Sequence, residues 1–64
     1  MSRFWVSKKS LIEALKLSEG RPDNACIMFD SESKVINGSE YTITKIEAFG
    51  KKKTVKQEFS KLYL

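Results

Sequence analysis

The sequence VINGSEY at residues 35–41 contains the clearest local signal for the fold. Asn37 and Gly38 stand between β-prone flanks, and both tolerate positive φ, so they favour the type I′ turn of a two-residue hairpin. Residues 41–46 are rich in β-branched side chains and extend the second arm of this hairpin. The stretch therefore predicts two antiparallel strands joined at Asn37 and Gly38.

Two further short strands are predicted before the hairpin. Residues 26–29 read CIMF and are apolar at every position, which is typical of a buried strand, and the polar residues 30–33 are expected to break it. Residues 3–6 contain the strand-prone run Phe4-Trp5-Val6, which polar residues then cut off. We expect this run to form the first strand.

A helix is predicted between these two strands, with two candidate starts. Ser7 offers an N-cap, and Val6 and Leu11 have the spacing of a hydrophobic staple around it. Ser10 with Glu13 instead fits a capping box. The helix therefore begins at about residue 8 or 11.

The same helix is predicted to end at Ser18. Gly20 stands where a left-handed C-terminal cap is wanted, and Pro22 disfavours continuation into the turn at residues 21–24. One stripe of the helix is expected to face the core. Its members are Leu11, Ile12, Ala14, Leu15 and Ser18.

The C-terminal segment fits two structures. Gly50 opens a polar connection at residues 51–53, and a stripe of apolar residues then recurs at helical spacing, with Thr54 and Gln57 as a capping box. The members of that stripe are Val55, Phe59, Leu62 and Tyr63. The alternative is a strand that pairs with residues 40–49, but its alternation is poorer, so we favour a helix over residues 54–63.

These elements predict an α+β fold for residues 1–64 as a small single domain. The sheet is an antiparallel hairpin extended to three or four strands, packed by one N-terminal helix and, in the helical alternative, by a C-terminal helix. A domain of this size buries only about 60% of the surface of its unfolded chain, so its stability is a few kcal/mol. A homodimer or a partner protein is therefore a reasonable source of further stability.

The residue inventory argues against most catalytic chemistry. The chain has no histidine and one cysteine, so it offers no His-based nucleophile pair, no disulfide and no tetrahedral zinc site. Its three glycines are isolated, so there is no phosphate-cradling glycine-rich loop. We expect a protein that is not an enzyme and uses no cofactor or metal.

No apolar run reaches the length of a signal peptide or a membrane span. We therefore expect no membrane association and a cytoplasmic location, where an unpaired cysteine stays reduced. Cys26 precedes three apolar residues, which predicts a buried thiol.

Charge is distributed unevenly along the chain. Residues 1–9 carry a net charge of +3, residues 10–44 a net charge of −3 and residues 45–64 a net charge of +4. Such asymmetry favours an anionic partner. The predicted contact residues are Trp5, which could stack on a base or anchor an interface, and the lysines Lys8, Lys9, Lys51, Lys52, Lys53 and Lys56.

These observations support two functions of different classes. The first is a non-enzymatic regulatory binding module that contacts nucleic-acid phosphates through the basic residues near the Gly50–Lys53 loop and the start of the first helix. The second is a small protein-binding inhibitor or adaptor, a phage-like accessory protein that docks on an acidic surface of a larger, nucleic-acid-handling protein.

Overall fold

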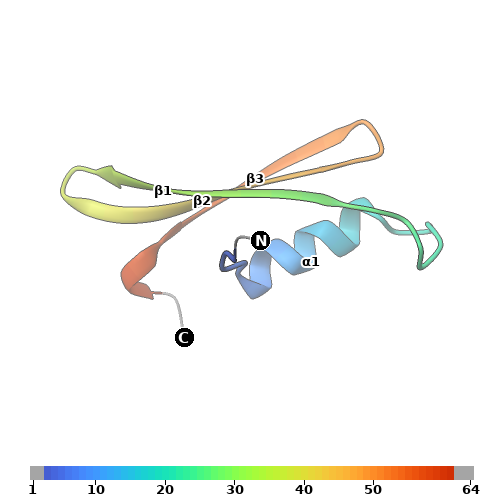
Figure 1. Cartoon of the computed structure of the whole chain (residues 1–64), viewed down its shortest axis with the longest axis horizontal. Helices are drawn as coiled ribbons and strands as arrows, with labels where there is room; N and C mark the ends of the chain where they lie inside the picture. The colour runs from blue at the N-terminus through green and yellow to red at the C-terminus, as the bar shows by residue number, and fades with distance from the viewer. Residues whose placement is uncertain (1–2, 62–64) are drawn as a thin grey trace.

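A computed structural model of the chain describes residues 3–61. It contains one α-helix, a three-stranded antiparallel sheet and a final 3-10 turn, which confirms the α+β fold class. The elements are α1 (Lys8–Leu17), β1 (Met28–Ile36), β2 (Ser39–Ala48), β3 (Lys51–Glu58) and η1 (Phe59–Lys61). The helix and η1 lie under opposite halves of the same face of the sheet (Figure 1).

The central hairpin forms as predicted. Asn37 and Gly38 have φ of 51° and 81°, and Ile36 pairs with Ser39 across the turn. The predicted break at residues 30–33 is wrong, because β1 continues through them and pairs with β2 along its whole length. Pairing of the backbone with a neighbouring strand outweighs the low strand propensity of this polar segment.

The C-terminal segment is a strand, so the predicted loop at residues 51–53 and the predicted helix over residues 54–63 are both wrong. Phe49 and Gly50, with φ of 53° and 74°, make a second two-residue turn, and β3 follows at once. The only helical turn within the described part of this segment is η1. Residues 62–63 of the predicted helix lie outside the described part of the chain. The strand prevails because β3 supplies hydrogen-bond partners to the second edge of β2, a gain that local periodicity does not reveal.

The helix begins at the first of its two candidate starts. The Ser7 side chain accepts a hydrogen bond from the backbone N–H of Ser10 at 3.1 Å, which is an N-cap. It ends one residue earlier than predicted, at Leu17, and Ser18 is its C-cap.

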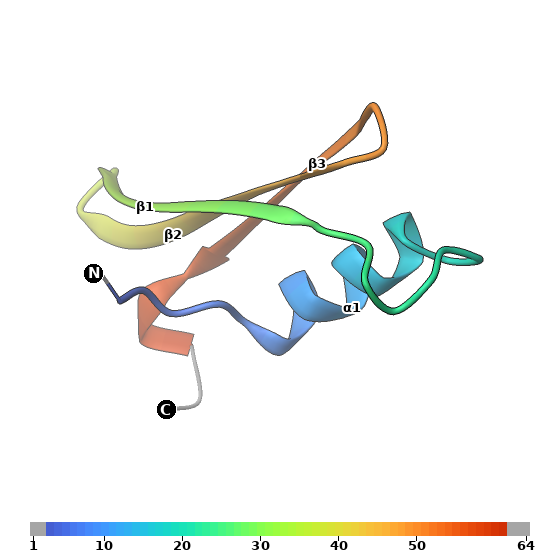
Figure 2. The same ribbon diagram turned by 45° about the vertical axis from the view of Figure 1, so that its right-hand side comes forward.

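The core is small and lies between α1 and the strands β2 and β3 (Figure 2). Its buried apolar residues are Ala14, Ile46 and Val55, with Leu17, Ile27 and Phe29 partly buried around them. The predicted core stripe is correct only in part. Ala14 and Ser10 face the sheet, whereas three larger apolar side chains of α1 are exposed, because small residues let the helix lie close to the strands. These exposed residues are Leu11, Ile12 and Leu15.

Two more predictions are wrong. Residues 3–7 belong to no helix or strand, so the predicted first strand at residues 3–6 does not form. Cys26 is exposed rather than buried, because β1 begins only at Met28 and the cysteine lies in the irregular connection before it. Its thiol donates only a weak, 3.8 Å contact to the backbone oxygen of Asn24. Within residues 3–61, no helix has the length and apolar character needed to cross a membrane.

Candidate nucleic-acid interface

The net positive charge of the described chain lies on one side of the fold. Helix α1 carries three lysines against Glu13, β3 carries four lysines against Glu58, and η1 adds Lys61. The remaining elements β1 and β2 and the connection at residues 18–27 each carry a net charge of −1, and the N-terminal segment at residues 3–7 adds the single cation Arg3. Because α1 packs against β3, the sheet has one basic side, along β3 and α1, and one weakly acidic side along β1.

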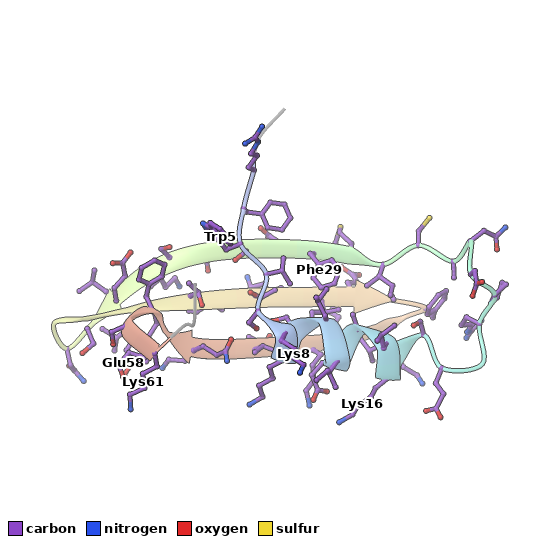
Figure 3. The ribbon with its side chains drawn as sticks, turned by 90° about the horizontal axis from the view of Figure 1, so that it is seen from below. Trp5, Lys8, Lys16, Phe29, Glu58 and Lys61 are labelled. Carbon is purple, nitrogen blue, oxygen red and sulfur yellow. The ribbon has the colours of Figure 1, made fainter. Side chains whose placement is uncertain are left out.

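We call the first of these the basic side. Its members are Lys8, Lys9, Lys16, Lys51, Lys52, Lys53, Lys56 and Lys61. Three of them, Lys8, Lys16 and Lys61, are labelled in Figure 3 and lie along one margin of the molecule, whereas Trp5 lies over β1.

Strand geometry divides the predicted run of three lysines between two faces. Lys51 and Lys53 stand opposite Ala48 and Ile46 and share the face that α1 covers. Lys52 stands opposite Glu47 on the other face. The lysines therefore do not converge as they would at the tip of a loop.

An ion-pair cluster connects the two elements of the basic side. The two Glu13 carboxylate oxygens lie 3.5 Å from Lys16 Nζ and 3.8 Å from Lys53 Nζ. Both lysine side chains remain more than half exposed, and one carboxylate cannot neutralise two ammonium groups. The cluster thus fixes Lys53 beside α1 and keeps a net positive charge there, although exposed pairs of this kind contribute little to stability.

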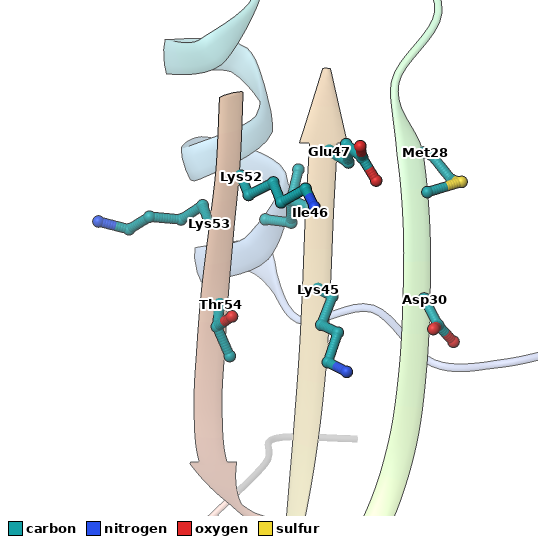
Figure 4. A pocket seen from close by; sticks show the side chains of 8 residues that line it. All are labelled: Met28, Asp30, Lys45, Ile46, Glu47, Lys52, Lys53 and Thr54. Atoms are coloured by element: carbon teal, nitrogen blue, oxygen red, sulfur yellow. The ribbon is translucent and has the colours of Figure 1, made fainter. Parts of the chain in front are cut away.

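The face of the sheet opposite α1 is electrically mixed, and no described element covers it. A hollow of about 360 Å³ lies on it, lined by alternating cations and carboxylates such as Lys45 opposite Asp30 and Lys52 opposite Glu47 (Figure 4). Lys56 belongs to this face too, with its ammonium group 4.8 Å from the centre of the Tyr41 ring. Lys52 and Lys56 are therefore less suited to phosphates than the lysines on the α1 face.

Trp5 lies on the α1 face of the sheet, 69% exposed. It lines a second hollow together with Phe4, which is 55% exposed, and Phe59, which is 36% exposed. Phe59 is not among the contact residues predicted from the sequence, because its spacing from Val55 places it in the apolar stripe of the predicted C-terminal helix. The polar and apolar residues of 51–58 alternate poorly, because Lys and Thr fill most of the positions, so the sequence gives only a weak signal for the strand that leads to Phe59.

Within residues 3–61, no three acidic, cysteine or histidine side chains gather in a group that could hold a metal ion. The chain matches no protein-family model, no curated protein and no solved structure.

Proposed function

We propose that the protein is a non-enzymatic binding module that contacts nucleic-acid phosphates through its basic side. The observation that carries this proposal is the segregation of charge, with eight lysines against two glutamates on α1, β3 and η1. Lysines on flexible stems suit phosphates, which require charge and tolerate loose geometry. Binding of this type is mostly independent of base sequence and falls steeply with salt.

The start of α1 adds a second argument. Its first turn carries Lys8 and Lys9 and no acidic side chain, although the helix dipole favours negative charge at this end. An anion bound here would interact favourably both with the two ammonium groups and with the helix terminus.

The lysines of β3 have a competing explanation. β3 is an edge strand, and charged residues on an open edge prevent pairing with the edge strands of other molecules. Edge protection does not account for Lys8, Lys9 and Lys16, which lie on the helix. The decisive experiment therefore changes the lysines of α1.

This experiment is fluorescence anisotropy of labelled single- and double-stranded oligonucleotides over a series of salt concentrations. The variant Lys8→Gln/Lys9→Gln is compared with Lys34→Gln/Lys45→Gln, which removes the same charge from β1 and β2. We expect the first variant to lower the salt slope by about 0.7–0.9 per lost phosphate contact and the control to leave it nearly unchanged. Absence of binding at low salt, or equal losses in both variants, would contradict the proposal.

The exposed apolar face of α1 favours a second function, a protein-binding inhibitor or adaptor. Leu11, Ile12 and Leu15 are 49%, 42% and 68% exposed, and an acidic partner would complement the lysines of the same helix. A pull-down after nuclease treatment tests this function. A stoichiometric band that is lost in Leu11→Gln/Leu15→Gln supports it, and no band counts against it.

The same apolar face would serve a homodimer. In that case the melting midpoint rises with protein concentration in the native chain and not in Leu11→Gln/Leu15→Gln. A midpoint independent of concentration in both proteins rules the homodimer out.

A further inference from the structure

Half of the α1 face of the sheet is left open by the helix. α1 covers the half nearer the turn at Phe49 and Gly50, while residues 3–7 and η1 border the half nearer the turn at Asn37 and Gly38 (Figures 2 and 3). A hollow of about 200 Å³ lies between residues 3–7 and η1, over the open half of the sheet. Aromatic side chains and hydroxyl groups line it, together with Glu32. These residues are Phe4, Trp5 and Phe59, and Ser31, Ser33 and Thr42.

We propose that this hollow binds one unpaired base of a single-stranded nucleic acid, stacked on Trp5. The proposal rests on the function inferred above and deepens it, because it names single strands as the substrate class. It also assigns a role to residues that the phosphate contacts leave unused.

The aromatic groups supply the main attraction. So small a domain needs its large apolar side chains inside, yet Trp5 is 69% exposed while Ala14 and Val55 fill the core. Stacking of a base on an exposed aromatic ring is favourable and tolerates any base, because every base has a π-face. A base entering the hollow would cover apolar surface that no described residue covers.

The floor of the hollow suits a polar planar ligand better than an aliphatic one. Ser31 Oγ lies 3.4 Å from Thr44 Oγ1, and Thr42 Oγ1 donates to the backbone oxygen of Gln57 at 3.4 Å. These hydrogen bonds are long, and a hydroxyl can both donate and accept. The hydroxyl groups can therefore still form hydrogen bonds with the polar edge of a base. The exposed Ser33 adds a third hydroxyl.

The charged residues around the hollow determine how a single-stranded nucleic acid would lie across it. Lys8 follows Trp5 by three residues and Lys61 follows Phe59 by two, and both lie toward the basic side in Figure 3. Glu32 also borders the hollow at the edge of β1, but strand alternation directs its side chain to the opposite face of the sheet, where its carboxylate lies 3.7 Å from Lys34 Nζ. The two lysines therefore place the sugar–phosphate backbone of the nucleic acid on the side of Lys8 and Lys61, and its base is directed toward β1.

The test uses the fact that Trp5 is the only tryptophan of the chain. Its emission is followed while a short unlabelled oligothymidylate is added, and anisotropy with labelled oligothymidylate and labelled duplex is measured in parallel. We expect the emission to be quenched with the same midpoint as the single-strand anisotropy. Trp5→Leu should weaken single-strand binding about tenfold and leave duplex binding unchanged, and Trp5→Phe should restore most of the loss.

Met28→Gln is the matched control, because it removes a comparably exposed apolar side chain from the face of the sheet opposite α1. It should leave single-strand binding unchanged. If oligothymidylate binds but Trp5 emission is constant and Trp5→Leu binds like the native chain, the base site is overturned. Phosphate binding by the basic side remains supported in that case. If neither oligonucleotide binds at low salt, the proposed function fails and the base site with it.

Discussion

The two halves of the α1 face differ in what they bury. In the half that α1 covers, the apolar side chains are buried, with Ile46 at 0% and Ala14 at 3% exposure. In the other half, hydroxyls line the floor while the large rings of Trp5 and Phe59 remain open to solvent. The difference indicates that the half beneath α1 stabilises the fold, whereas the open half contributes little to the core.

The largest effect is expected from Ile46→Ala. Ile46 is fully buried and its removal leaves a cavity, so the free energy of unfolding should fall by about 2–4 kcal/mol, close to the total for so small a domain. Chemical denaturation followed by circular dichroism measures this change. Trp5→Leu, in the open half, should change the same quantity by less than about 0.5 kcal/mol. Equal losses in the two variants would remove the distinction between the halves.

Ser7→Ala should have an intermediate effect. It removes the hydroxyl that accepts from the backbone N–H of Ser10, so stability should fall by about 1 kcal/mol. Ser33→Ala, a hydroxyl on the floor of the open hollow, should leave stability unchanged and weaken single-strand binding. Thermal melting and the anisotropy assay together separate the two serines. A stability loss in Ser33→Ala equal to that in Ser7→Ala would show that the floor also supports the fold.

The smallest effect on stability is expected from Glu13→Gln. The change removes the carboxylate shared by Lys16 and Lys53, whose pairs are largely exposed, so stability should fall by about 0.5 kcal/mol or less. Oligonucleotide affinity should rise, and rise most at low salt, because the basic side gains one net positive charge. Unchanged affinity at low salt would mean that this part of the basic side does not approach the phosphates.

Local rules succeeded where a few neighbouring residues decide the conformation. The Asn37-Gly38 turn and the Ser7 cap both formed because positive φ and a single side-chain hydrogen bond are properties of the residues themselves. The same rules failed over residues 54–58, where the helical spacing of apolar residues predicts a helix and the structure has the second half of β3. There the pairing of Val55 with Thr44, eleven residues earlier in the chain, determined the outcome.

The candidate site was predicted less completely than the fold. Composition alone indicated an anionic partner, and the lysines of α1 and β3 do lie on one side. Lys51, Lys52 and Lys53 are consecutive in the sequence and were predicted to act together, but strand alternation separates Lys52 from the other two. Nothing local indicated that Phe59 would lie beside Phe4 and Trp5, since these residues are brought together only by the path of β3.

The sequence by itself thus determined the fold class, the central turn, two candidate starts for the helix and the excess of positive charge. These follow from residue-level preferences and from counting. Only the tertiary structure decided that the C-terminal segment is a strand, that α1 turns its small residues to the sheet and that three rings border one hollow. Each of these depends on contacts between residues distant in the chain, whose free energies outweigh local propensity.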